Sequence, residues 1–278
     1  MATIVSLAMT ATILGGCGNA SSGSQTSSSS QGAASTASAT ETTSADSSAI
    51  DPATQVAGKR WIALGDSLTE KNSLAKTSYY DYAVDELGCV VENYGKSGTG
   101  YKEAGPFEPF YERVAQMDLA NTDCVTVFGS FNDLGKGFEL GTAEDETTDT
   151  IGGCMNLTMQ RLIDGNPQMA VGIVTPTRWL TGFGFTKDGK MDWHLITREE
   201  CDAYVQLLKD VAARHGLPVL DLYNEFSVDP DNEEHQKLYY GEGDAKDPMF
   251  VHPNSEGHKL MYPLWREFII GLMTGTKA

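Results

Sequence analysis

A short apolar run that ends abruptly in a polar turn is the feature that most constrains this fold. Residues 61–64 read Trp-Ile-Ala-Leu, and Gly65, Asp66 and Ser67 follow at once. An apolar run of this length, bounded by a turn, is typical of a strand buried on both faces of a helix-covered sheet. Ligands of such sheets bind just beyond the carboxyl ends of the strands. The strand therefore carries the hydroxyl of Ser67 to that edge, although the same turn could equally serve only to start the next helix.

Strand-like and helical segments alternate along the rest of the chain. Further strands are predicted at residues 89–94, 124–128, 169–174 and 217–222. Helical spacing of apolar residues predicts helices at 78–87, 108–118, 150–164 and 198–215, and a last one to about Met273. Residues 177–196 are expected to be an aromatic, glycine-containing loop, and residues 223–247 an acidic loop. The alternation predicts an α/β protein: a three-layer α/β/α sandwich around a five-stranded, mainly parallel sheet.

Polar blocks follow three of these strands or precede the last helix, and they come in a definite order. After Gly65-Asp66-Ser67 come residues 93–98 (Asn-Tyr-Gly-Lys-Ser-Gly), 128–133 (Phe-Gly-Ser-Phe-Asn-Asp) and 252–254 (His-Pro-Asn). This ordered set resembles the SGNH, or GDSL, hydrolase family, which is named for its Ser, Gly, Asn and His blocks. The resemblance covers about residues 58–273. It implies a flavodoxin-like fold and a serine ester hydrolase.

The resemblance also implies a role for each block. Ser67 is expected to be the nucleophile and His252 the general base, forming an acyl-enzyme that water resolves. The backbone N–H groups of Ser67 and Gly98 and the side-chain amide of Asn132 are expected to hold the oxyanion. Asp66 is expected to be structural. The resemblance implies no metal or organic cofactor, and the sequence has no Cys/His ligand spacing for a structural zinc site.

Two positions depart from the family pattern. The family carries an aspartate three residues before its histidine, but Met249 stands there in this chain. The candidates for orienting His252 are Asp247, then Asp244, or a backbone carbonyl that would leave a Ser-His dyad. The second departure is Ser130, which stands where the family usually has the glycine of Gly-x-Asn-Asp.

The substrate is constrained less tightly by the sequence. The aromatic residues of the 177–196 insertion could shape a cleft or simply pack on their own domain. Since aromatic faces stack on sugar rings, we expect removal of acetyl or other short acyl groups from a carbohydrate. A lysophospholipase or thioesterase activity and a non-catalytic glycan-binding lipoprotein on the same scaffold are the alternatives.

The first fifth of the chain predicts export and anchoring. Residues 1–17 read as a signal peptide that ends in Leu-Gly-Gly-Cys, the pattern of a bacterial lipobox with Cys17 as the lipid-modified residue. Residues 18–57 are rich in Ser, Thr, Ala and Gly and are expected to be a disordered tether. The hydrolase domain is predicted at 58–278. We therefore expect an extracytoplasmic protein, lipid-anchored at the bacterial membrane surface or secreted.

The net charge limits the kinds of partner that the chain can bind. The chain has 20 basic and 38 acidic residues, a net charge of −18. Because nucleic-acid binding needs a basic face, nucleic acid is excluded as a partner, and membrane contact is expected only through Cys17. The expected partner is a small acyl ester or acylated glycan, bound by a monomer.

Free thiols are expected at four positions: Cys89, Cys124, Cys154 and Cys201.

Overall fold

The computed structural model describes residues 51–103, 105–180, 183–185, 191–243, 246–247 and 249–275, and for residues 183–185 and 191–195 the backbone alone. The predicted signal peptide and most of the predicted tether lie outside these residues. The packed part of the chain begins earlier than the predicted boundary at residue 58. A short 3₁₀-helix, η1 (Pro52–Gln55), precedes Val56, and the side chain of Val56 is fully buried. Residues 52–57 therefore belong to the domain.

Five parallel strands form the central sheet, and this confirms the predicted fold class. The strand order is β2-β1-β3-β4-β7, and every neighbouring pair is parallel. This is the order of flavodoxin-like folds, in which the chain reverses direction across the sheet between β1 and β3. The strands are β1 (Arg60–Gly65), β2 (Val90–Gly95), β3 (Cys124–Phe128), β4 (Ala170–Val174) and β7 (Val219–Leu220).

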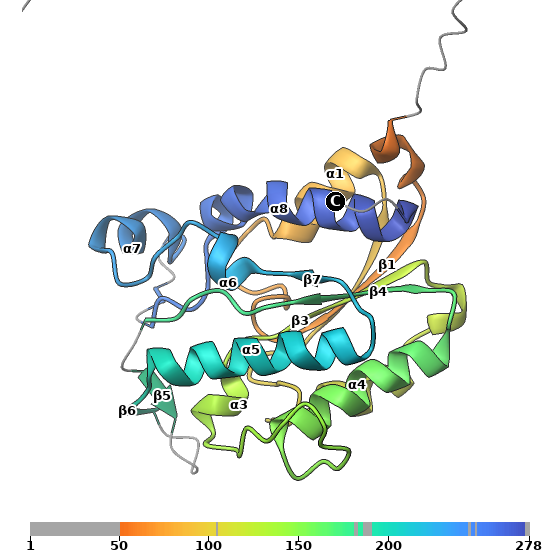
Figure 1. Cartoon of the computed structure of the whole chain (residues 1–278). Coiled ribbons are helices and arrows are strands. Elements are labelled where there is room, and N and C mark those ends of the chain that lie inside the picture. The colour runs from red at the N-terminus through yellow and green to blue at the C-terminus, as the bar shows by residue number, and fades with distance from the viewer. Residues whose placement is uncertain are drawn as a thin grey trace, which may run out of the picture. The chain divides into compact units, whose positions relative to one another are not determined.

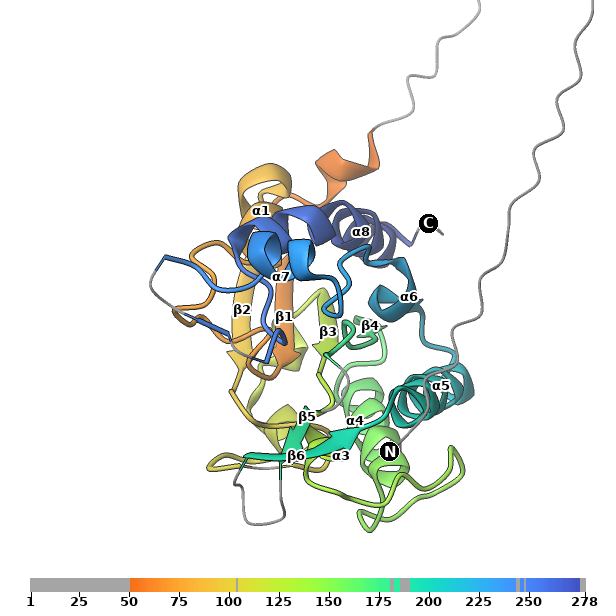
Figure 2. The same ribbon diagram turned by 90° about the vertical axis from the view of Figure 1, so that its left-hand side faces the viewer.

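Helices cover both faces of the sheet (Figures 1 and 2). Helices α1 (Tyr79–Leu87) and α8 (Ser255–Thr274) lie on one face, and α4 (Ile151–Gly165) and α5 (Arg198–Arg214) lie on the other. Successive residues of β1 enter different cores, since side chains alternate across a strand. Ile62 and Leu64 pack in the core under α4 and α5, whereas Trp61 and Ala63 pack in the core under α1 and α8. The inner strand β1 is thus buried on both faces, whereas the edge strand β2 is largely exposed.

The predicted helix ends are confirmed where a local capping signal is present. Thr197 and Glu200 form a capping box at the start of α5. Gly88 ends α1 with a φ of 66°, a left-handed conformation that favours glycine. The helix predicted at 108–118 is shorter, comprising α2 (Phe110–Arg113) and the 3₁₀-helix η2 (Val114–Gln116).

Three segments differ from the sequence-based expectation. The 177–196 insertion contains an antiparallel hairpin of β5 (Phe183–Phe185) and β6 (Met191–Ile196). The acidic loop holds α6 (Leu222–Glu225) and α7 (Glu233–Tyr239). Helix α7 has no buried residue, so its sequence carries no apolar stripe that would have predicted it. The fifth strand is only two residues long, because Asp221 already caps α6.

The parallel arrangement brings the carboxyl ends of β1, β2 and β3 to one edge. The three polar blocks of the sequence follow these strands, so they meet at the point where the strand order reverses. A short helix, α3 (Asn132–Gly135), starts there after β3. None of the helices in the described ranges is long and apolar enough to span a bilayer. All four described cysteines are buried and unpaired.

Candidate active site

Ser67 and His252 meet at this edge although 185 residues separate them. Ser67 lies two residues beyond β1, and His252 lies three residues before α8. The Nε2 atom of His252 is 2.8 Å from the Oγ atom of Ser67. This is a normal hydrogen-bond distance, and it lets a neutral imidazole accept the serine proton.

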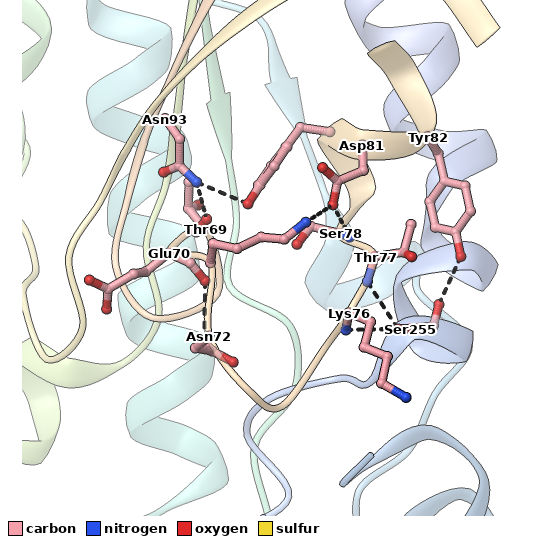
Figure 3. A network of polar contacts seen from close by, with 12 residues as sticks. Thr69, Glu70, Asn72, Lys76, Thr77, Ser78, Asp81, Tyr82, Asn93 and Ser255 are labelled. Atoms are coloured by element: carbon pink, nitrogen blue, oxygen red, sulfur yellow. Dashed lines mark hydrogen bonds and ion pairs between the residues drawn. The ribbon is translucent and has the colours of Figure 1, made fainter. Parts of the chain in front are cut away.

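A network of hydrogen bonds ties together the chain segments that carry this pair (Figure 3). The Oγ atom of Ser255, at the start of α8, accepts the backbone N–H groups of Lys76 (3.0 Å) and Thr77 (3.1 Å). Lys76 and Thr77 end the segment that follows Ser67, and Ser255 follows closely on His252. These bonds therefore hold the serine and histidine segments side by side.

Asp247 reaches the far side of the imidazole. Its Oδ2 atom lies 3.3 Å from Nδ1 of His252, and its side chain is only 2 % exposed. Asp244, the second candidate, lies outside the described residues. Of the predicted orienting groups, the structure therefore brings Asp247 to the ring, across a rather long contact.

A tight turn absorbs the two extra residues between Asp247 and the histidine. The N–H of Phe250 donates to the carbonyl of Asp247 (3.2 Å), and Phe250 has a φ of 50°. Oδ2 of Asp247 also accepts the N–H groups of Val251 (2.7 Å) and His252 (2.6 Å). The carboxylate is thus folded back onto its own loop. The side chain of Met249 faces the cavity described below.

These contacts also set the ionisation of Asp247. Burial raises its pKa, but hydrogen bonds and the charge of His252, with the N–H groups of the loop, outweigh burial. The pKa therefore lies below the usual value of 3.8. The carboxylate remains ionised at neutral pH beside the imidazole.

Gly98 offers a backbone donor next to the serine. Its φ is 76°, in the left-handed region where glycine is unstrained, and it lines the same cavity as Ser67. Among the contacts of the described residues, no hydrogen bond uses the N–H of Ser67 or of Gly98. Both donors are available to a ligand.

The side chain of Asn132 lies beside them, but its amide is already engaged. Its Nδ2 donates to the carbonyl of Thr99 (2.9 Å) and to Oδ2 of Asp66 (3.2 Å). An amide nitrogen carries two hydrogens, so both are used in the resting site. To serve as an oxyanion donor, Asn132 has to exchange its longer bond, the one to Asp66.

Ser130, the departure from the family pattern, makes that exchange easier. Asp66 is fully buried, and its Oδ2 accepts both the N–H (2.6 Å) and the hydroxyl (2.5 Å) of Ser130. Burial raises the pKa of Asp66, and the hydrogen bonds from Ser130 and the N–H of Leu68 oppose that rise. Oδ2 therefore keeps two donors when Asn132 leaves it. Asp66 is structural, as the sequence indicated.

If Asn132 does supply an oxyanion donor, replacing it with alanine is expected to lower kcat on 4-nitrophenyl acetate by about 10²–10³-fold with little change in KM. Initial rates across a range of ester concentrations measure both constants. Asn121→Ala, at an exposed position, is the matched control. A loss of less than about tenfold would show that the two backbone donors suffice.

Arg113 is a buried residue of this region that sequence patterns did not reveal. Its guanidinium donates to the carbonyls of Tyr94 (2.5 Å) and Gly65 (2.8 Å) and to the hydroxyl of Thr99 (3.1 Å). Burial lowers its pKa to about 10. The arginine ties together the loops that follow β1 and β2. A lone arginine at the end of a short helix carries no periodic signal, so it could not be found from the sequence.

The carboxylate of Asp133 binds the backbone of the glycine-rich loop. It accepts the N–H groups of Tyr101 (3.0 Å), Lys102 (3.1 Å) and Glu103 (2.7 Å). A Cβ at Gly100 would lie 2.5 Å from Oδ1 of Asp133, so only glycine fits there. Burial raises the pKa of Asp133 to about 6, against the effect of these donors. The sequence analysis assigned no role to Asp133, which follows Asn132 directly in the block after β3.

A cavity of about 440 Å³ opens over Ser67 and His252. Trp179 forms part of its wall and packs edge-on against Phe131 at a ring-centroid distance of 5.5 Å. Among the aromatic residues of the insertion, Trp179 therefore reaches the cavity. For residues 183–185 and 191–195 the structure describes the backbone alone. The other lining residues are Asn72, Ser73, Leu74, Ser97, Gly98, Gly105, Pro106, Asn132, Lys136, Met249 and Val251.

Two other observations narrow the location of the site. A larger groove of about 660 Å³ between β4, β7 and α8 is lined by apolar residues and glycines and holds no titratable side chain. In the ranges that the structure describes, no three His, Cys, Asp or Glu side chains are grouped to hold a metal ion. The cavity at Ser67 is the candidate site because it holds the hydrogen-bonded pair of Ser67 and His252.

A serine paired with a histidine beyond the first strand of a parallel α/β/α sandwich defines a hydrolase of the serine type. The sequence agrees, since residues 63–260 match the model of the GDSL-like Lipase/Acylhydrolase family. The chain belongs to this family. A search of curated proteins finds no match.

Solved structures share the fold at low sequence identity. A protein from Lactobacillus plantarum is 22% identical with a TM-score of 0.65, over 77% of this chain and 97% of that one. A lipase/acylhydrolase from Enterococcus faecalis is 19% identical (TM-score 0.51; 77% and 96%). Axe2, an acetylxylan esterase from Geobacillus stearothermophilus, is 18% identical (TM-score 0.51; 78% and 96%). At these identities the likeness shows the fold.

Proposed function

We propose that the chain is a serine ester hydrolase that removes acetyl or other short acyl groups from a carbohydrate. The observation that carries the proposal is the 2.8 Å contact between Ser67 Oγ and His252 Nε2 inside the cavity. A serine hydroxyl is a weak nucleophile unless a base takes its proton, and this contact supplies the base.

The proposed reaction follows from the contacts. His252 removes the proton from Ser67 as Oγ attacks the ester carbonyl, and Asp247 stabilises the imidazolium that forms. The N–H groups of Ser67 and Gly98, joined by Asn132, hold the oxyanion. The imidazolium then gives its proton to the leaving alcohol. Water, activated by the same histidine, hydrolyses the acyl-enzyme and frees Ser67.

The size and lining of the cavity support a short acyl group and a compact alcohol. A volume of about 440 Å³ is in the lower part of the range for small-molecule sites. Trp179 offers an apolar wall, and Ser73 and Ser97 offer hydroxyl groups. The structural likeness to an acetylxylan esterase is in keeping with a glycan substrate. A lysophospholipase or thioesterase remains the second candidate, because the family includes lipases by name.

A comparison of three substrates tests the proposed substrate class. The kcat/KM for acetate release from acetylated xylo-oligosaccharides is expected to be at least about tenfold higher than that for a long-chain lysophospholipid or an acyl thioester. A factor of about ten corresponds to one additional favourable contact between the substrate and its pocket. Higher kcat/KM for the lysophospholipid would favour the second candidate. Absence of hydrolysis with all three would favour a glycan-binding protein.

We further propose that the domain works outside the cytoplasm on a lipid anchor at Cys17, as the lipobox pattern of the sequence predicts. A tether between Cys17 and residue 52 would hold the cavity away from the membrane surface and within reach of polymeric glycans.

A further inference from the structure

We propose that Lys136 forms a subsite for an anionic group on the substrate, so that the ester cleaved is part of a carboxylate-bearing molecule. The inference rests on the proposed ester hydrolase function and adds the charge of its substrate. Lys136 lines the cavity that holds Ser67 and His252. Among the described residues that line this cavity, no other is a Lys, Arg, Asp or Glu.

The backbone places Lys136 next to the predicted oxyanion donors. Its N–H donates to the carbonyl of Asn132 (3.1 Å), one turn earlier on α3. Residues four apart share one face of a helix, with Cβ atoms about 5–6 Å apart. Asn132 and Lys136 therefore line the same wall. A group bound by Lys136 lies within the length of one small substrate from the ester carbonyl.

The ammonium group of Lys136 has no hydrogen-bond partner among the described residues. Its nearest carboxylate oxygen, Oε1 of Glu103, is 3.9 Å away, beyond hydrogen-bond distance. That oxygen already accepts the N–H of Gly105 at 2.6 Å. The Lys136 side chain is only 26 % exposed, so its donors have limited access to water. Charged donors in such places gain most from a ligand that accepts their hydrogen bonds.

A neighbouring lysine shows the opposite arrangement. Lys102 lies on the loop clamped by Asp133, but its Nζ donates to the carbonyl of Thr148 and lies over the ring of Phe138. Lys102 does not line the cavity. Lys136 therefore has only the 3.9 Å ion pair with Glu103, without a hydrogen bond, whereas the ammonium of Lys102 is hydrogen-bonded.

The remaining charges make Lys136 decisive for an acidic substrate. The chain has a net charge of −18, and carboxylates at Asp66 and Asp247 lie directly behind Ser67 and His252. Because Asp247 is ionised, an anionic substrate gains from the positive charge of Lys136 in the same cavity. For an anion bound in the cavity, a nearby cation outweighs distant surface charges, because salt screens charges beyond about 8–10 Å.

Matched pairs of charged and neutral esters test the subsite. On the acyl side the pair is 4-nitrophenyl hydrogen succinate and its methyl ester, and on the alcohol side it is the acetylated methyl glycosides of glucuronate and glucose. The wild type is expected to prefer one charged member by about 10–100-fold in kcat/KM, the range for a charged hydrogen bond. The pair that shows the preference identifies which part of the substrate carries the anion.

Substitution then assigns the preference to one side chain. Lys136→Met is expected to abolish it, Lys136→Arg to retain most of it, and the control Lys102→Met to leave it unchanged. An unchanged charged-to-neutral ratio in Lys136→Met, with all esters still hydrolysed, overturns the subsite and leaves the proposed function intact. If the wild type hydrolyses no ester, the proposed function falls. Calorimetric titration with glucuronate and succinate then decides the subsite, since binding lost in Lys136→Met supports it and absence of binding to the wild type overturns it.

Discussion

Replacing Ser67 with alanine is expected to lower kcat on 4-nitrophenyl acetate by about 10⁴–10⁶-fold, the range for loss of a serine nucleophile. The physical reason is that His252 then has no hydroxyl to activate, and only the oxyanion donors and substrate binding remain. Steady-state rates measure the loss, and a fluorophosphonate probe is expected to label the wild type at Ser67 and not the variant.

The control for this experiment is Ser227→Ala, at an exposed serine outside the cavity. It is expected to keep wild-type rates and labelling. Thermal unfolding of both variants checks that the domain is intact. Retention of more than about a tenth of the wild-type kcat in Ser67→Ala would refute the nucleophile assignment.

The second large effect is expected for Asp247→Asn, which keeps the shape of the side chain and removes its charge. If the carboxylate fixes the tautomer of His252 and stabilises the imidazolium, kcat should fall by up to about 10⁴-fold. If the long contact of 3.3 Å contributes little, the loss should stay below about tenfold, and the site would work as a dyad. The comparison of kcat for the two proteins separates these results.

The pH dependence of stability gives an independent measure of the same contact. Because the pKa of Asp247 in the folded protein lies below 3.8, its ionised form stabilises the fold above that pH. This contribution is lost as the pH falls through the lowered pKa. The gap in unfolding free energy between the wild type and Asp247→Asn should therefore be constant near neutral pH and shrink below about pH 4. A gap that does not change with pH would contradict the stabilising contribution of the ionised carboxylate.

Local signals explain why much of the fold was predictable. The buried strands β1 and β3 and the ends of α1 and α5 each depend on a few neighbouring residues, namely an apolar run, a glycine or a capping box. The parallel order then follows from the strand–helix alternation, and it brings Ser67 and His252 to one edge. Elements that lack such a signal were missed, as with α7, which has no buried residue.

The supporting contacts of the site were less predictable for a different reason. Arg113 and Ser130 act through atoms that are close only in three dimensions, on Gly65 and Asp66 respectively. The position of Asp247 depended on the backbone of Phe250, whose φ of 50° nothing in the sequence required. Spacing alone left Asp247, Asp244 and a carbonyl as alternatives, because a loop can fold in more than one way.

The turn between Asp247 and His252 has a mechanical consequence. Three of the contacts of the carboxylate, to the N–H groups of Val251 and His252 and to the imidazole, come from its own loop. Acid and base therefore belong to one loop, which leads directly into α8. A displacement of that loop by substrate, heat or mutation is expected to change the distance from the imidazole to Ser67 more than the distance from the imidazole to the carboxylate. Catalysis should therefore be more sensitive to changes in the distance between Ser67 Oγ and His252 Nε2 than to changes in the distance between His252 and Asp247.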